Sequence, residues 1–155
     1  MSVTADGAAS RVRELMERIA AVAGVDATVE VHQGPDGLNA EYIGDELEVL
    51  IGHHGETIDA IQHLAYRIAR PNDGERLSVL VDAAGYRERR AKALRAVADQ
   101  AAETAVSDRR PVSLEVMNAL ERKVIHEYLK GRRDVETFSE GQEPSRHLVV
   151  APLVD

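Results

Sequence analysis

The stretch Ile51-Gly52-His53-His54-Gly55-Glu56-Thr57-Ile58 sets two glycines around two histidines at the start of a helical pattern. Glycine adopts backbone conformations that other residues avoid, and a turn of this kind lets a phosphate approach the N–H groups of a helix N-terminus. A G-x-x-G sequence occurs by chance in many chains, so by itself it fits a plain turn between two helices equally well. The elements on either side of the turn therefore decide its interpretation.

The residues before the turn predict a helix, a strand pair and a short helix. Ser10 is a good N-cap, and apolar residues recur at helical spacing from Val12 to Ala20, until Gly24. Residues 27–32 and 38–43 alternate like strands around the turn residues 33–37, and residues 46–51 predict a very short helix. Residues 1–10 offer little to pack and are expected to be disordered.

The residues after the turn predict two further strand-and-helix groups. A helix begins at Glu56 and stops at residues 70–74, and a strand follows at residues 77–81. A long helix over 84–106 has a seam made almost entirely of alanine, followed by a short strand at 112–114 and a helix over 116–130 that ends at Gly131. Strands at 135–139 and 146–151 close the chain. This order predicts an α+β protein of two small units joined by the long helix.

The charge is distributed unevenly along the 155 residues. The net charge is −8, which by itself argues against a polyanionic partner. Residues 1–85 hold 6 Lys/Arg against 15 Asp/Glu, a net −9, whereas residues 86–155 hold 13 against 12, a net +1. Because the cations cluster in the C-terminal half, local patches there can still bind phosphate.

One polar stripe in that half recurs every four residues: Asn118, Arg122, His126 and Lys130. This spacing places the four side chains along one side of the predicted helix, turned away from Leu120 and Val124. Such a stripe is more often a solvated helix face than a binding site, since Arg, Lys and Asn are usually exposed.

The two-glycine turn, in its setting between helices and strands, resembles a KH domain. The order αββααβ resembles the type II, bacterial form, in which the G-x-x-G loop clamps the backbone of about four unpaired nucleotides. KH loops usually carry Lys or Arg between the glycines, whereas this loop carries His53 and His54, which are mostly neutral at pH 7. A metal site on this histidine pair is not favoured, because adjacent side chains on a turn rarely converge without further ligands.

The spacing of Arg122 and His126 resembles the signature of the R-three-H domain, which binds single-stranded nucleic acid, and residues 135–146 fit that family's following strand and turn. A KH domain followed by an R-three-H domain is similar to the bacterial Jag proteins, also called KhpB or EloR. The resemblance implies a KH domain over residues 11–83 and an R-three-H domain over 84–155, with helix 84–106 as the junction. Jag proteins often begin with a further domain; about ten residues precede the first predicted helix here, and membrane roles of that domain are not carried over.

The resemblance implies single-stranded RNA, or single-stranded DNA, as the ligand. It also implies a post-transcriptional regulator or RNA chaperone linked to cell elongation, division and envelope synthesis. The alternative is an interaction scaffold whose KH half pairs with a small single-KH protein or with itself, with RNA binding secondary. The candidate nucleic-acid-binding residues are Gly52, His53, His54, Gly55, Arg87, Arg90, Arg122, His126, Lys130 and Arg146.

Other functions find no support in the residues. Cysteine is absent, which excludes disulfides, thiolate nucleophiles and Cys-based zinc sites. Nucleotide-binding glycine loops, clustered carboxylates and hydrolase motifs are not found, so we expect a non-enzyme without cofactor or metal. With no apolar run long enough for a membrane span and no signal-peptide pattern, the expected location is cytoplasmic. The five aromatics, Tyr42, Tyr66, Tyr86, Tyr128 and Phe138, are too scattered for a stacking platform, so sequence preference is expected to be loose.

Overall fold

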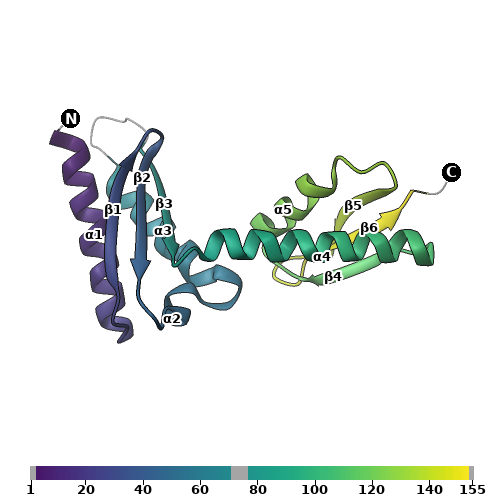
Figure 1. Ribbon diagram of the computed structural model, residues 1–155, viewed down its shortest axis with the longest axis horizontal. Helices are drawn as coiled ribbons and strands as arrows, with labels where there is room; N and C mark the ends of the chain where they lie inside the picture. The colour runs from purple at the N-terminus through teal and green to yellow at the C-terminus, as the bar shows by residue number, and fades with distance from the viewer. Residues whose placement is uncertain (1–2, 71–76, 154–155) are drawn as a thin grey trace. The chain divides into compact units, whose positions relative to one another are not determined.

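The computed structural model describes residues 3–70 and 77–153. The chain divides into two compact units between Arg87 and Glu88, and each unit combines helices with a three-stranded sheet (Figure 1). The predicted α+β class is confirmed. The predicted domain boundary between residues 83 and 84 lies slightly earlier in the chain and stays a prediction.

Unit 1 is a three-stranded sheet covered on one face by two helices (Figure 1). Its strand order is β1-β2-β3, with β1 antiparallel and β3 parallel to β2. Along the chain its elements are α1 (Val3–Ala23), β1 (Thr28–Gly34), β2 (Gly37–Ile43), α2 (Glu48–Ile51), the 3-10 turn η1 (His53–Gly55), α3 (Glu56–Ala69) and β3 (Ser78–Ala83).

The core of unit 1 lies between the helices and the sheet because apolar residues alternate along the strands. Leu38, Ala40 and Tyr42 of β2 are all buried on one face, and Met16 of α1 packs in the same cluster. The Tyr42 hydroxyl donates a hydrogen bond to the carbonyl oxygen of Met16 at 2.7 Å, and burial raises the pKa of this tyrosine. A buried hydroxyl is thereby satisfied inside an apolar core.

The first helix starts earlier than its cap signal predicts. The expected disorder of residues 1–10 is wrong for residues 3–10, which form the first turns of α1. Ala8 is buried one turn before Val12, and Ala9 packs against the same core, so the helix continues onto the core before its cap signal. Residues 1 and 2, and the turn predicted over residues 71–74, lie outside the described residues.

Unit 2 packs helices and an antiparallel sheet around a cluster rich in alanine. Most of α4 (Tyr86–Asp108) belongs to it. Ala98, Ala101 and Ala105 are buried in the seam that the sequence predicts, and Ala102 is buried beside them. The remaining elements are β4 (Val112–Val116), α5 (Ala119–Leu129), β5 (Val135–Glu140) and β6 (His147–Pro152), with β6 central in the order β4-β6-β5. None of the helices described has the length and apolar character needed to cross a membrane.

The helix α5 begins three residues later than predicted. The strand β4 continues to Val116, and Asn118 then forms the N-cap, its side chain accepting a hydrogen bond from the backbone N–H of Glu121 at 2.9 Å. Asn118 therefore closes the start of α5 instead of extending the polar stripe along it.

Candidate nucleic-acid interface

Both glycines of the two-glycine turn are required by its geometry. Gly52 has φ +74°, and a Cβ placed there would lie 2.2 Å from the Thr57 hydroxyl oxygen. Gly55 has φ +81°, and its Cβ would lie 2.7 Å from the ring of Tyr86. Both residues adopt the left-handed region that glycine enters without strain, and both lie closer to neighbouring atoms than any side chain permits.

The two histidines between the glycines stack on each other. The ring centroids of His53 and His54 lie 3.8 Å apart at an interplanar angle of 27°, with His53 exposed and His54 half-buried. His54 has φ 52°, a conformation rare outside glycine that keeps the turn tight before α3. The loop therefore offers a compact imidazole surface and glycine backbone instead of a flexible lysine or arginine.

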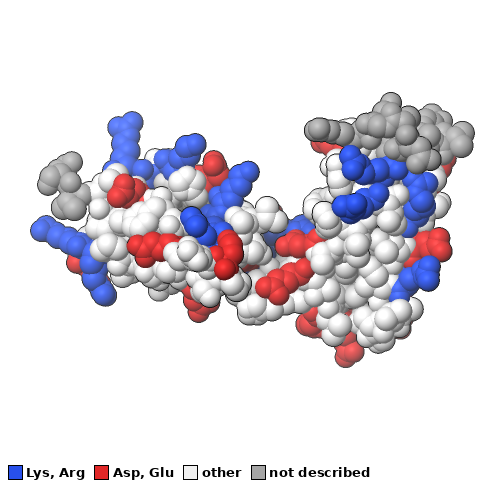
Figure 2. Space-filling view, turned by 180° about the vertical axis from the view of Figure 1, so that it is seen from behind, with Lys and Arg blue, Asp and Glu red and all other residues white. Residues whose placement is uncertain are grey.

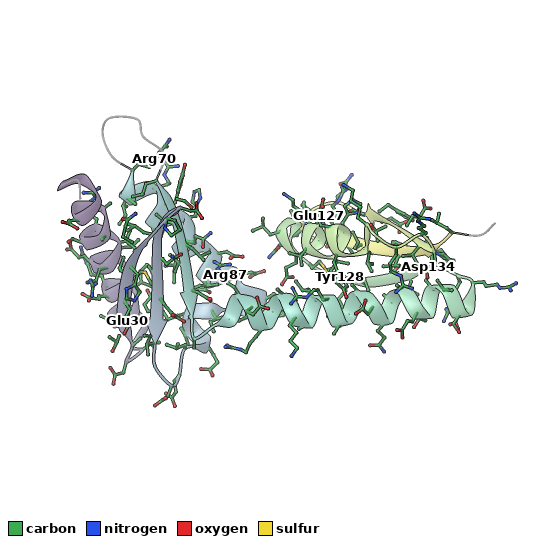
Figure 3. All side chains as sticks on the ribbon, turned by 45° about the horizontal axis from the view of Figure 1, so that its top comes forward. Glu30, Arg70, Arg87, Glu127, Tyr128 and Asp134 are labelled. Carbon is green, nitrogen blue, oxygen red and sulfur yellow. The ribbon has the colours of Figure 1, made fainter. Side chains whose placement is uncertain are left out.

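Arg87, labelled in Figure 3, is held by hydrogen bonds within unit 1. Its Nε donates to the carbonyl oxygen of Val81 at 2.7 Å, Nη1 to Asp59 Oδ1 at 2.7 Å and Nη2 to Gln62 Oε1 at 3.1 Å. Gln62 Oε1 also accepts from the N–H of Val81 at 2.9 Å. The guanidinium thus ties β3 to α3, the helix that starts at the loop.

Arg90 and Glu121 form an ion pair inside unit 2. The Arg90 Nε atom donates to Glu121 Oε1 at 2.6 Å, and the Glu121 side chain is almost fully buried. A buried carboxylate needs a partner of this kind. This contact links the first turns of α4 in unit 2 to the start of α5.

Arg122, the arginine of the Arg-x-x-x-His motif, is buried. Only 7% of the residue is exposed, and its Nη1 donates to the carbonyl oxygens of Met117 at 2.6 Å and of Arg146 at 3.3 Å. Its Nη2 donates to the Glu143 carboxylate on the loop between β5 and β6. This guanidinium joins three separate segments of unit 2, so the expectation of a solvated stripe along α5 is wrong for Arg122.

His126, one helical turn after Arg122, is exposed. Its Nδ1 lies 2.5 Å from the Thr137 hydroxyl oxygen on β5, a contact that fixes the orientation of the ring. Since Nδ1 is engaged with Thr137, Nε2 is the ring atom left to meet a ligand.

A concavity of about 550 Å³ lies over these residues, between α5, β5 and the loop that follows β5. Its charged and polar lining combines exposed side chains with the buried Arg122. The lining residues are Ala119, Arg122, Lys123, His126, Thr137, Phe138, Ser139, Glu143, Arg146 and Leu148. The hollow therefore presents cationic, imidazole and hydroxyl groups side by side, the groups that bind phosphate and sugar oxygens.

The other predicted cations of unit 2 take different positions. Arg146 lines the concavity, and its Nη1 donates to the carbonyl oxygen of Gly141 at 3.4 Å. Lys130 is the exposed C-cap of α5 and is not among the lining residues. The structure thus brings Arg122, His126 and Arg146 together. Arg87 and the four loop residues lie in unit 1, Arg90 pairs with Glu121, and Lys130 lies outside the concavity.

The lining residues that were missed as site residues include Lys123, Thr137 and Phe138. Lys123 is exposed. Its position directly after the motif arginine is the signal by which the sequence could have identified it. Thr137 and Phe138 lie in a strand whose burial alternates, and only the pairing of β5 with β6 and the packing of α5 bring them to the motif.

One ion pair and one hydrogen bond outside the concavity shift the pKa of Asp134 and of Tyr128. A two-point hydrogen bond from Arg132 to Asp134, at 2.8 and 2.6 Å, holds the pKa of Asp134 below its ordinary value. A hydrogen bond from the Tyr128 hydroxyl to Asp99 at 2.9 Å raises the pKa of Tyr128, which points from α5 toward α4 (Figure 3). Across the residues described, no group of three or more His, Asp or Glu side chains could hold a metal ion.

The sequence of this chain is similar to a known domain family and to several known proteins. Residues 92–152 match the R-three-H domain family. The chain is 35% identical over 127 residues to "RNA-binding protein KhpB" of Clostridium symbiosum, covering 82% of this chain and 57% of that protein. It is 36% identical over 143 residues to the protein of the same name from Lactiplantibacillus plantarum, covering 90% and 44%.

A third relative, "RNA-binding protein KhpB" of Bacillus subtilis, is 31% identical over 133 residues, covering 84% of this chain and 64% of that protein. The matches thus span most of this chain but only about half to two thirds of each relative. With an R-three-H domain in its second unit and similarity to these relatives through both units, the chain belongs to the KhpB family, also called Jag.

Proposed function

We propose that this protein binds single-stranded RNA, with the concavity between α5 and β5 as its main contact. The observation that carries the proposal is the gathering of Lys123, His126 and Arg146 around one hollow on a rigid frame. Single-stranded nucleic acid is held mainly through its phosphates, which need cations and hydrogen-bond donors at fixed positions. The names of the three relatives, each called an RNA-binding protein, support the same ligand.

Within this site we assign different roles to the two residues of the motif. Arg122 uses its donors on Met117, Arg146 and Glu143, so it positions the loop after β5 and the start of α5. His126 and the neighbouring Lys123 are exposed and meet the RNA directly. The arginine thus shapes the hollow, and phosphate contact falls to Lys123, His126 and Arg146.

Unit 1 is proposed to act as a type II KH domain. Its order of elements, α1-β1-β2-α2-η1-α3-β3, and the two positions of its turn that require glycine support this assignment. The loop of such a domain holds a nucleotide backbone against glycine N–H groups. With histidines instead of lysines in the turn and a net −9 over residues 1–85, we assign it a weaker, guiding contact.

The one aromatic residue at the concavity bears on how the bases of the RNA are recognised. Phe138 is 41% exposed and lines the concavity, so one base has a ring to stack on. A single aromatic at the hollow favours loose sequence preference.

By family membership we extend the proposal to post-transcriptional regulation or RNA chaperoning in cell elongation, division and envelope synthesis. The acidic charge of residues 1–85 favours the second candidate, a scaffold that pairs through unit 1 with a small KH protein.

The decisive experiment measures binding of a labelled single-stranded RNA of about 20 nucleotides by fluorescence anisotropy, from about 50 to about 300 mM salt. Lys123→Ala should weaken binding and flatten the slope of log K against log salt by about 0.7. Lys92→Ala is the matched control, since Lys92 is an exposed cation of α4 in the same unit, outside the concavity. Arg122→Ala should weaken binding with the slope unchanged.

The proposal fails if Lys123→Ala and Lys92→Ala have the same effect, or if the wild-type protein shows no salt-dependent binding. In the second case the scaffold function takes its place. A slope that falls by about 0.7 for Arg122→Ala would show instead that Arg122 meets a phosphate.

A further inference from the structure

One carboxylate lies among the cations of the concavity in unit 2. Glu143 lines this hollow together with Lys123 and Arg146, and 59% of its side chain is exposed. Basic and acidic side chains are also intermixed over the face of unit 2 at the left of Figure 2. A carboxylate repels the phosphates on which single-stranded binding depends. Glu143 must therefore face a part of the strand other than a phosphate.

The carboxylate of Glu143 is held in place by the buried arginine of the motif. Arg122 Nη2 donates to Glu143 Oε1, and Nη1 of the same guanidinium donates to the carbonyl oxygen of Arg146 at 3.3 Å. Glu143 also lies within a turn that is closed by a hydrogen bond from the N–H of Ser145 to the carbonyl oxygen of Gln142 at 2.8 Å. Because Arg122 is anchored beneath the hollow, it fixes the position of the carboxylate at the rim.

The second carboxylate oxygen of Glu143 is left for a ligand. Among the described residues, Oε2 has no hydrogen-bond partner, since the contact with Arg122 uses Oε1. An ionised carboxylate only accepts hydrogen bonds, so the group that meets Oε2 has to be a donor. Phosphate oxygens are acceptors. The donors along an RNA strand are the ribose 2′-hydroxyl and the N–H groups of the bases.

We propose that Glu143 accepts a hydrogen bond from a ribose 2′-hydroxyl and thereby makes the concavity select RNA over DNA. This inference rests on the proposed binding of a single strand in the concavity. Arg122 holds Glu143 beside the backbone of Arg146, whose side chain is a proposed phosphate contact. The 2′-hydroxyl is the donor nearest to a phosphate along the strand, whereas base edges point away from the backbone.

The chemistry of the 2′-hydroxyl agrees with the other properties of the hollow. A hydrogen bond from a hydroxyl to a carboxylate is charge-assisted, so it offsets the repulsion between Glu143 and the neighbouring phosphates. Every ribonucleotide carries this hydroxyl, and DNA lacks it. A contact of this kind distinguishes the sugar without reading the base, as expected of a site with one exposed phenylalanine and a loose sequence preference.

The first test varies the strand and leaves the protein unchanged. Fluorescence anisotropy compares RNA, 2′-deoxy and 2′-fluoro strands of one sequence without uracil or thymine, so that all three carry the same bases. Fluorine keeps the sugar pucker of RNA but donates no hydrogen bond. We expect RNA to bind about tenfold more tightly than either other strand, because Glu143 then faces the strand without a donor. Equal affinities for the RNA and the 2′-fluoro strand overturn the inference.

The second test varies the protein. Glu143→Ala should bind the RNA and the 2′-deoxy strand alike, because both the acceptor and the repelling charge are gone. Glu140→Ala removes an exposed carboxylate outside the concavity and should keep the preference of about tenfold. Lys123→Ala should weaken both strands by the same factor, since both carry phosphates. A preference for RNA that survives Glu143→Ala overturns the inference.

The two proposals fail in different ways. If Lys123→Ala weakens both strands and the wild-type protein does not distinguish them, binding in the concavity stands and the role of Glu143 falls. If Lys123→Ala has no more effect than Lys92→Ala, the concavity itself is not the site. An effect of Glu143→Ala that is equal for cytidine RNA and cytidine DNA, and absent for uridine RNA, would assign Glu143 to a base amine and overturn the contact with the sugar.

Glu143→Gln guards against a loss of fold in the alanine variant, which circular dichroism melting detects. Its amide oxygen still accepts from Arg122, while the position of Oε2 becomes a neutral NH₂ group. The preference for RNA should fall to about threefold or less, because a neutral hydrogen bond is roughly half as strong as a charge-assisted one. An unchanged preference in a folded Glu143→Gln protein contradicts the inference.

Discussion

Arg122 and His126 lie one turn apart on α5 but stand in opposite relations to solvent: the guanidinium is buried beneath the concavity, and the imidazole lies exposed at its rim. The arginine binds two carbonyl oxygens and a carboxylate from separate segments. The side chain of His126 has one hydrogen-bond partner among the residues described, the hydroxyl of Thr137. A four-residue motif therefore combines one residue that builds the site with one that faces the ligand.

Arg122→Met should lower the free energy of unfolding by about 2 kcal/mol, because two carbonyl oxygens lose their donor while Glu143 stays largely solvated. Urea unfolding measures the change, provided that both proteins have the same m value, the slope of unfolding free energy against urea concentration. Lys123→Met, at the exposed neighbouring position, should stay within about 0.5 kcal/mol of wild type. Equal stability of the two variants would contradict the positioning role of Arg122.

Thr137→Val should weaken RNA binding about fivefold and leave its salt slope unchanged, since the hydroxyl orients His126 without touching a phosphate. Fluorescence anisotropy over the same salt series gives both quantities. Ser113→Val, at an exposed position of β4, should bind RNA like the wild type. An unchanged affinity for Thr137→Val would show that the orientation of His126 does not matter.

Gly55→Ala should destabilise unit 1 by more than Gly24→Ala, although both glycines have φ near +75°. An alanine at either position costs about 1 to 2 kcal/mol for the left-handed backbone. Only at Gly55 does the new methyl group also meet the ring of Tyr86, whereas nothing lies within 4 Å at Gly24. Similar unfolding free energies for the two variants would mean that Tyr86 moves aside without cost.

Asn118→Ala should cost about 1 kcal/mol, because the side chain that caps α5 at the N–H of Glu121 is lost. Asn118→Asp keeps the acceptor and should unfold close to wild type. Thermal unfolding of the three proteins decides the matter. A loss of RNA affinity in both variants without a loss of stability would instead place Asn118 in the interface.

Asp134→Asn should weaken the dependence of the unfolding free energy on pH in the acid range. The bond from Arg132 lowers the pKa of Asp134 in the folded protein, so its contribution to stability is present above the ordinary Asp value near 3.9 and is lost as the pH falls through the lower folded value. Denaturation series between about pH 5 and pH 2 measure the slope. Asp36→Asn, in the turn between β1 and β2, should keep the wild-type slope.

Periodicity predicted the elements of both units well. The alternation of Leu38, Ala40 and Tyr42 gives a strand with one buried face, and the spacing of Ile58, Ile61 and Ala65 gives α3 its buried side. These patterns are local, so each stretch of chain carries them by itself. Where the pattern is weak, as in residues 3–10, packing of Ala8 and Ala9 against the core accompanies the extension of α1 beyond its cap signal.

The roles of individual side chains were less accessible from sequence. An arginine on a helix is usually solvated. The carbonyl oxygen of Arg146 and the carboxylate of Glu143 accept hydrogen bonds from Arg122, but both lie more than twenty residues away in the chain, so the local sequence does not predict these contacts. Arg87 is a parallel case, since Asp59 and Gln62 lie more than twenty residues away. Such contacts exist only once the strands have paired and the helices have packed.

The continuous helix α4 also governs how the protein can be divided. Its first two residues, Tyr86 and Arg87, belong to unit 1, and the match to the R-three-H family begins at residue 92, still inside the same helix. A fragment that starts at residue 88 or 92 would begin inside the helix, with unpaired backbone N–H groups in its first turn. An N-terminal fragment that ends before residue 86 would lack the Tyr86 ring, which lies against Gly55. Separate expression of the units therefore calls for overlapping fragments, each keeping the first turns of α4.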